Sequence, residues 1–255
     1  KDSYRNEEER KKLLSIIIRV VPVISNEFNN ILQRDVFTTD DEGRRLPYVR
    51  ELCEISLTGL ETAFLCKHVP EMLIKLAFNE WMIKEIENKN QFFFRHKEVE
   101  ESFGLEEYGS ASNFFPASGL KGPFQYLLRF HPRRGLDFII ELLNLTVEKY
   151  GNSDLDSPER YSSLPIDTSS IGVGKVRIQL NDGGTIEQYC SSRLWLGYRG
   201  FSVMPYLLQS ALMALENWLI SYAEYTKSSE TLEWIFNYIL KNSNSVAPTA
   251  ILVSI

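Results

Sequence analysis

The stretch SVMPYLLQSALMALENWLISYAEY, from Ser202 to Tyr225, decides the fold class of this chain. Its apolar side chains, among them Leu208, Leu212 and Leu215, return at the spacing of one face of an α-helix. Ser202 is a residue type that caps the first turn of a helix. The stretch therefore predicts the strongest helix of the chain, and the same periodicity can be followed outward from it.

Further stretches with helical periodicity lie on both sides. They are Glu7 to Gln33 with a break at Pro22, Pro47 to Lys67, Val69 to Asn88, Arg133 to Tyr150 before Gly151, Ser229 to Leu240, and an apolar stretch that starts at Val246. The connection between the second and third of these stretches is short, which predicts that Pro47 to Lys67 and Val69 to Asn88 form an antiparallel helix pair. Residues 91–122 mix aromatic side chains with glycines, so we expect irregular structure around one short helix there.

One segment follows a different period. Residues 175–180 alternate apolar and polar side chains, residues 181–184 supply turn residues, and residues 185–190 can return as a second strand. The sequence therefore predicts a mainly α fold, with antiparallel helix pairs in a bundle or an irregular solenoid and one β-hairpin near residues 175–190. No fixed-period repeat indicates an ankyrin or TPR array.

The organisation along the chain follows from these elements. We expect a helical subdomain over residues 1–151, a connecting loop rich in Ser, Asp, Pro and Gly over residues 152–174, and a hairpin plus helical subdomain over residues 175–255. The chain starts at Lys1 and stops at Ile255 inside an apolar run, so we expect it to be a piece of a longer protein, truncated at its C-terminal end.

Composition narrows the possible partners and the compartment. The formal charge of −6 and the pI near 5.3 oppose a broad nucleic-acid surface, which needs clustered cations. The three cysteines form no C-x-x-C pair, which favours a reducing compartment, so we expect a cytoplasmic protein. No apolar run approaches the roughly 20 residues of a membrane span.

Known catalytic and ligand-binding patterns fit poorly. Gly172 to Lys175 could suggest a phosphate loop, but Ser169 stands where that loop needs glycine, and Val176 where it needs Ser or Thr. The histidines lie far apart and no G-x-S-x-G pattern is present. We therefore expect no metal site, no cofactor and no catalytic residues in this segment.

The most unusual stretch is Arg193 to Phe201, which places two arginines and three aromatic residues around glycines just before the long helix. Arg193, Trp195, Tyr198 and Arg199 could form a recognition surface for an anion or a partner chain. The alternative, which we favour, is that these aromatic rings pack the hairpin onto the helix while Arg199 bonds backbone carbonyls. Arg133 and Arg134 form a second candidate patch, and a solvated helix face explains it better than nucleic-acid contact.

Two stretches carry a resemblance. The first runs from Leu194 through Tyr198-Arg199-Gly200 and Pro205-Tyr206 to Trp218-Leu219, and the second from Phe115-Pro116-Ala117 to His131-Pro132. Both resemble regions of large multidomain bacterial ATP-binding proteins. Several of these are NTPases of anti-phage defence, including the STAND type, in which an NTPase core is joined to long helical regions. The resemblance covers about a third of the chain, and no nucleotide-binding residues carry over, because the Walker motifs are absent.

The resemblance implies a non-catalytic helical scaffold, sensor or oligomerisation module of a larger bacterial NTPase. Its partners would be other domains of the parent chain, with a further oligomer or protein partner. An alternative is a helical enzyme domain whose site at the junction of hairpin and long helix uses Arg199, Tyr198 and a carboxylate such as Glu216. A third idea, nucleic-acid contact through Arg129 to Arg134, has less support from the charge balance.

Overall fold

The computed structural model describes residues 2–38, 46–83, 97–106, 113–157, 172–180, 182–200, 203–226 and 228–255. Helices make up most of this part of the chain, and a two-stranded antiparallel hairpin lies beside them. The predicted mainly α fold with a hairpin near residues 175–190 is therefore confirmed. None of the helices described is long and apolar enough to pass through a membrane.

The elements are numbered in chain order. They are α1 (Asp2–Val20), α2 (Ser25–Ile31), the π-helix η1 (Leu32–Val36), α3 (Pro47–Thr58), α4 (Thr62–His68), α5 (Pro70–Trp81), α6 (Lys97–Ser102), α7 (Phe124–Phe130), α8 (Pro132–Gly151), β1 (Gly174–Gln179), β2 (Thr185–Cys190), α10 (Ser192–Leu196), the 3-10 helix η3 (Gly197–Arg199), α11 (Tyr206–Tyr225), α12 (Ser229–Asn242) and α13 (Val246–Ser254).

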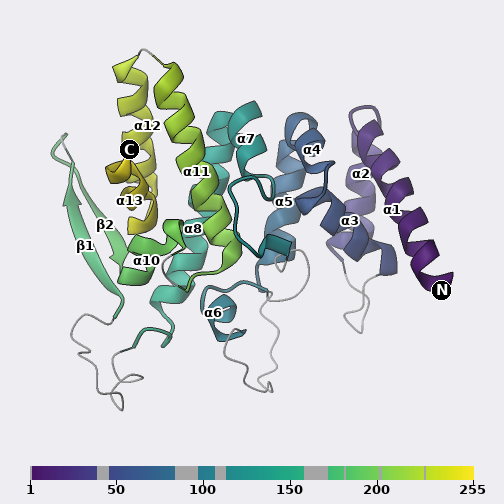
Figure 1. Cartoon of the computed structure of the whole chain (residues 1–255), viewed down its shortest axis with the longest axis horizontal. Helices are drawn as coiled ribbons and strands as arrows, with labels where there is room; N and C mark the ends of the chain where they lie inside the picture. The colour runs from purple at the N-terminus through teal and green to yellow at the C-terminus, as the bar shows by residue number, and fades with distance from the viewer. Residues whose placement is uncertain are drawn as a thin grey trace.

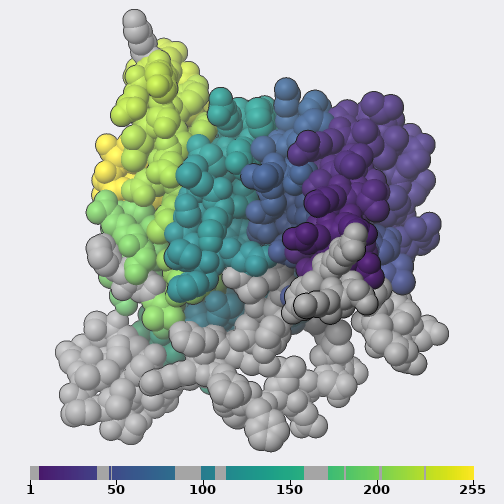
Figure 2. Space-filling view, turned by 45° about the vertical axis from the view of Figure 1, so that its right-hand side comes forward, coloured from purple at the N-terminus to yellow at the C-terminus, as the bar shows by residue number. Residues whose placement is uncertain are grey.

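The helices stand side by side and follow one another along the longest axis of the molecule (Figure 1). Helix α1 lies at one end, and α12, α13 and the hairpin lie at the other. Figure 2 shows the same order from a second direction. Contacts agree with this view, since α4 packs on α7, α7 packs on α8 and α11, and α11 packs on α13. The arrangement resembles an irregular solenoid more than a compact bundle.

Prolines and one glycine set the helix boundaries in the first half. Pro22 lies in the turn between α1 and α2, where the sequence predicted a break. Pro47 and Pro70 occupy the first turns of α3 and α5, where no backbone N–H is needed. The helix predicted from Pro47 to Lys67 is divided into α3 and α4. At the division Gly59 turns extended, so close to Ile55 that a Cβ would lie 2.5 Å from the Ile55 carbonyl oxygen.

The long helix α11 starts at Tyr206 rather than at Ser202. Pro205 precedes it with an extended backbone (φ −50°, ψ 131°), and a proline also pushes the residue before it out of the helical region. The predicted periodicity therefore holds, while Pro205 moves the start. Ser202 lies outside the described residues, so its predicted capping role stays a prediction.

A cluster of aromatic rings fills the core between α5, α7 and α8. The fully buried ring of Trp81 lies 5.5 Å from Phe114, 5.7 Å from Phe124 and 6.0 Å from Phe138, measured between ring centroids. Phe114 belongs to residues 91–122, the stretch of aromatic side chains and glycines for which the sequence predicted irregular structure. Phe92, Phe93 and Phe94 of that stretch lie outside the described residues.

The segment after Phe115 runs along α11 and brings the two halves of the chain together. The backbone N–H of Ser118 donates to Ser210 Oγ at 3.1 Å. A Cβ on Gly119 would lie 2.9 Å from the carbonyl carbon of Met213, so this close approach requires glycine. Buried side chains from before and after residues 152–174 belong to one hydrophobic core. The division into subdomains at residues 152–174 stays a prediction.

The hairpin pairs Gly174 with Cys190 and Gln179 with Thr185. Gly183 adopts a φ of 84° in the connection, a conformation that favours glycine in a short hairpin loop. The base of the hairpin is fixed to the chain between α12 and α13, because Tyr189 N donates to the Asn244 carbonyl at 2.7 Å. The far end of the hairpin contacts α12, because Lys241 Nζ of α12 lies 2.5 Å from Asp182 Oδ2 in the hairpin connection.

Candidate functional site

The residues around Arg193 form the most connected polar cluster near the predicted site. Its first member is Tyr150, in the last turn of α8, where the fully buried ring stacks on Phe103 with centroids 4.5 Å apart. After Gly151 the chain turns back on itself, and Ser153 N donates to the Tyr150 carbonyl at 3.0 Å. This turn brings Asp156 to the phenol, and Tyr150 Oη donates to Asp156 Oδ2 at 2.5 Å.

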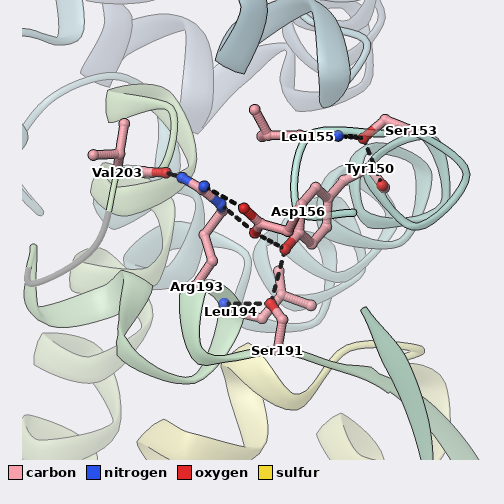
Figure 3. Close-up of polar contacts among 8 residues, drawn as sticks. All are labelled: Tyr150, Ser153, Leu155, Asp156, Ser191, Arg193, Leu194 and Val203. Carbon is pink, nitrogen blue, oxygen red and sulfur yellow. Dashed lines mark hydrogen bonds and ion pairs between the residues drawn. The ribbon is translucent and has the colours of Figure 1, made fainter. Parts of the chain in front are cut away.

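Arg193 reaches the same carboxylate from the other side (Figure 3). It lies in α10, a helix capped by Ser191, whose Oγ accepts from Leu194 N at 3.2 Å. Arg193 Nε and Nη2 donate to Asp156 Oδ2 and Oδ1, each at 2.7 Å, which is the strong bidentate geometry of an arginine–carboxylate pair. Arg193 Nη1 donates to the carbonyl oxygen of Val203.

The cluster is closed by Ser191, whose Oγ lies 2.9 Å from Tyr150 Oη. The side chains of Arg193 and Asp156 are only 14% and 12% exposed. We name Tyr150, Asp156, Ser191 and Arg193 the junction cluster. It joins the end of α8, the turn that follows, and the connection from β2 to α10 (Figure 3).

The protonation states in the junction cluster follow from burial and hydrogen bonding. Burial raises the pKa of the Tyr150 phenol, and its hydrogen bond to the Asp156 carboxylate raises it further. Burial acts to lower the pKa of the Arg193 guanidinium, but the pair with Asp156 outweighs it and raises that pKa. A phenol that stays neutral cannot serve as a base near pH 7. Both oxygens of the Asp156 carboxylate accept hydrogen bonds from the Arg193 guanidinium. These hydrogen bonds join the end of α8, the turn after it and α10.

The other predicted residues of this stretch lie next to the cluster. Tyr198 is buried, and its hydroxyl accepts from Arg199 Nε at 2.8 Å. Trp195 is 41% exposed on α10. Burial of Tyr198 agrees with the packing alternative, and in this stretch Arg193 donates to a backbone carbonyl, that of Val203. The backbone-carbonyl bond expected for Arg199 stays a prediction. Phe201 lies outside the described residues.

The glycines of this stretch have steric reasons. A Cβ on Gly197 would lie 2.3 Å from Met204 Sδ, so a side chain would collide with the segment that leads into α11. Gly200 has a φ of 69°, the left-handed conformation that ends η3. Both glycines are thus explained by chain geometry, and neither needs a ligand to account for it. Glu216, the carboxylate of the alternative enzyme site, lies well inside α11, about 15 Å along the axis from Tyr206 at 1.5 Å per residue.

Arg133 and Arg134 are not part of the junction cluster. They lie in the first turn of α8, and a helix of 20 residues separates the two ends by about 30 Å. Arg133 Nε lies 3.3 Å from Asp137 Oδ1, and its guanidinium lies over the Tyr238 ring at 3.9 Å. Arg134 Nε lies 2.9 Å from Glu71 Oε1. Each of these arginines therefore has a carboxylate beside it.

A cavity large enough for a small molecule lies elsewhere in the molecule. It has a volume of about 410 Å³ and lies between α2, η1 and the start of α5. Its lining residues are Asn29, Gln33, His68, Val69, Pro70, Glu71, Met72 and Lys75. None of the residues predicted as a binding site lines it.

The described histidines serve local contacts. His131 Nε2 lies 3.0 Å from the Lys67 carbonyl oxygen, and the His68 ring packs against Phe64. His96 lies outside the described residues. Across the described ranges, no three or more His, Cys, Asp or Glu side chains gather closely enough to hold a metal ion.

Sequence reasoning named Arg193 but missed the other members of the junction cluster. Asp156 is one of several acidic residues in a polar connection, and Tyr150 reads as a core position at the end of an amphipathic helix. Nothing in their spacing indicates that a turn returns Asp156 to Tyr150. The one usable signal is Ser191 before a short helical run, a typical capping residue.

No protein-family model matches the sequence of this chain, and no curated protein matches it either.

Proposed function

We propose that this chain is a non-catalytic helical scaffold, sensor or oligomerisation module of a larger bacterial NTPase. The carrying observation is that the polar side chains at the most distinctive stretch bond one another. Arg193, Asp156, Tyr150 and Ser191 hold three chain segments together, with the ion pair at 2.7 Å. Asp156 and the Val203 carbonyl already accept from three nitrogens of Arg193, so fewer of its five N–H donors are left for a free anion.

The exposed surface of α1 supports the protein partners in this proposal. Leu13, Ile16 and Val20 recur at helical spacing and are 61%, 59% and 43% exposed. Helix α1 forms the surface at its end of the row of helices (Figure 2). A contiguous apolar row on a surface helix is typical of a contact with another chain or domain. Other domains of the parent chain, or a protein partner, are the expected occupants.

The bacterial NTPase parent, with a role in anti-phage defence, is part of the proposal. It is supported by the resemblance of the stretches 115–132 and 194–219. The cytoplasmic location is likewise proposed, and the scattered cysteines support it. Two of them, Cys53 and Cys66, are buried, and burial raises the pKa of the Cys66 thiol well above its usual range, which makes that thiol unreactive.

The test is calorimetric titration of the purified chain with magnesium–ATP, with phosphate release measured in parallel. The proposal expects no saturable heat and no phosphate release, because the nucleotide site belongs to another part of the parent. A saturable isotherm that disappears when Arg199 is replaced by Met, in a variant that unfolds at the same urea concentration, would instead support an enzyme site beside α11.

A further inference from the structure

Strand β1 has an edge that no other described strand pairs with, called its open edge below. Within the described residues the sheet consists of β1 and β2 alone, so β1 pairs on one side only. Leu180 N donates to the Gly184 carbonyl at 2.8 Å, which makes this pair a hydrogen-bonded one. Because bonded and non-bonded pairs alternate in an antiparallel ladder, the backbone groups of Lys175, Arg177 and Gln179 point away from β2.

The opposite edge of the hairpin confirms this register. Tyr189, the partner of Lys175, donates its backbone N–H outward to the Asn244 carbonyl at 2.7 Å. The outer edge of β2 is thus partly used by the chain between α12 and α13. The edge of β1 offers the corresponding N–H and C=O groups at Lys175, Arg177 and Gln179, on the side of the hairpin that faces away from the helices (Figure 1).

The side chains along this edge carry a charge pattern. Lys175 and Arg177 share one face of β1 and are 49% and 81% exposed. Both lie near a single carboxylate, Glu187, at 3.4 Å and 3.5 Å, so one positive charge is in excess. The other face carries the apolar side chains of Val176 and Ile178, and Val176 is 37% exposed.

This pattern decides which strand can pair with the edge. A second copy of β1 could pair antiparallel with this edge so that the polar faces of both strands lie on the same side. Arg177 would then lie opposite Lys175, Gln179 or the Arg177 of the other copy. Like charges directly opposite each other destabilise a strand pair. Strand β2 shows what does fit, because Glu187 lies opposite Arg177 and Ile186 lies opposite Ile178. A partner strand therefore needs carboxylates at alternate positions with apolar side chains between them.

We propose that the open edge of β1 binds an extended acidic segment of a partner protein by strand addition. The segment's backbone pairs with Lys175, Arg177 and Gln179, and its alternate carboxylates lie beside the Lys175 and Arg177 side chains. Main-chain hydrogen bonds supply the affinity and the charge pattern supplies the selectivity. This surface needs neither nucleotide nor a particular parent protein, so it goes beyond the proposed function and can fail independently of it.

The test uses two synthetic eight-residue peptides, one alternating glutamate with valine and one alternating lysine with valine. Fluorescence anisotropy with the whole chain measures both affinities. We expect saturable binding of the glutamate peptide and at least tenfold weaker binding of the lysine peptide. Arg177→Glu should weaken the glutamate peptide at least tenfold, whereas Arg129→Glu, the same charge change on α7, should leave its affinity within twofold.

A backbone variant separates strand addition from simple charge attraction. Gln179→Pro removes an outward N–H and changes no charge, and an edge strand tolerates proline at such a position. Its binding should fall at least fivefold while the backbone amide signals of Ile178 and Ile186 keep their protection from hydrogen exchange. Absence of glutamate-peptide binding, equal affinity for both peptides, or unchanged binding by a Gln179→Pro variant with an intact hairpin would each overturn the proposal. If Gln179→Pro loses the hairpin, hydrogen exchange of the unmodified chain decides instead. Strand addition predicts that peptide binding protects the backbone amides of Lys175, Arg177 and Gln179. Unchanged exchange at these three amides would refute it.

Discussion

Gly151, the last residue of α8, lies directly against the ring of Tyr189 in β2. A Cβ at position 151 would lie 2.4 Å from Tyr189 Cε1, far inside normal contact distance. The sequence predicted Gly151 as a helix terminus, and α8 does end there. Gly151 is absent from the positive-φ glycines, so its role is close packing of the hairpin rather than left-handed backbone.

Replacing this glycine should have different effects on the free energy of unfolding in two backgrounds. Gly151→Ala should lower the free energy of unfolding by about 1 kcal/mol or more, as overpacking does, although alanine normally favours helices. In a Tyr189→Ala background the same change should be neutral or stabilising by a few tenths of a kcal/mol, roughly the helix preference of alanine. Urea unfolding of the four proteins measures both effects. Equal effects of Gly151→Ala in both backgrounds would show that the ring is not the obstacle.

The junction cluster should be sensitive to loss of one partner. Arg193→Met leaves Asp156 without its cation in surroundings where both side chains are 14% and 12% exposed. We expect the free energy of unfolding to fall by about 3 kcal/mol, as for a broken buried ion pair. The matched control is Arg134→Met, which removes an exposed pair with Glu71 and should cost about 0–1 kcal/mol. Similar losses for the two variants would argue against a special role of the junction cluster.

Asp35 in η1 should make stability depend on acid pH. Hydrogen bonds from Arg34 and from the Tyr48 hydroxyl lower the pKa of Asp35 to about 2. The pKa of an aspartate in the unfolded chain is about 3.9, so folding lowers the pKa of Asp35. The stabilisation that Asp35 gives the folded state is therefore complete above about pH 5 and is lost as the pH falls toward 2. The urea midpoint of the unmodified chain should therefore fall more steeply between about pH 5 and pH 2.5 than that of Asp35→Asn. Parallel pH profiles would contradict the assigned shift.

The apolar row on α1 should drive association of the isolated chain. Light scattering after size-exclusion chromatography should show a mass that rises with protein concentration, because an uncovered apolar row is an association surface. Ile16→Glu should reduce this rise. Leu60→Glu, at a position 91% exposed but isolated in a turn, is the control and should leave the rise unchanged. A concentration-independent monomer, or equal effects of both substitutions, would remove this support for a protein partner.

The fold was largely predictable because the period of the apolar side chains differs between a helix and a strand. The apolar spacing of the helices now called α8, α11 and α12, and the alternation of β1 and β2, gave elements of the right type. Boundaries were harder, since they depend on backbone sterics at single positions. Gly59 divides a predicted helix because its chain folds against Ile55, and Pro205 delays the start of α11.

The candidate site was predictable only in part, because its contacts are long-range. Arg193 stood out by composition, yet its partner Asp156 comes from a turn 37 positions earlier in the chain. The same holds for Arg133, whose ring partner Tyr238 lies on another helix. A single sequence shows which residues can make an ion pair or a stacked contact, but it does not show which chain segments the fold brings together.

The central claim is that the junction cluster fastens the hairpin and α10 to α8. A double-mutant cycle on Arg193→Met and Asp156→Asn, measured by urea unfolding, tests it most directly. The account predicts a coupling energy of about 2 kcal/mol, because replacing either side chain already removes the ion pair between them. A coupling energy below about 0.5 kcal/mol, the level found for independent sites, would contradict this claim. Ligand binding would then be the better interpretation of Arg193.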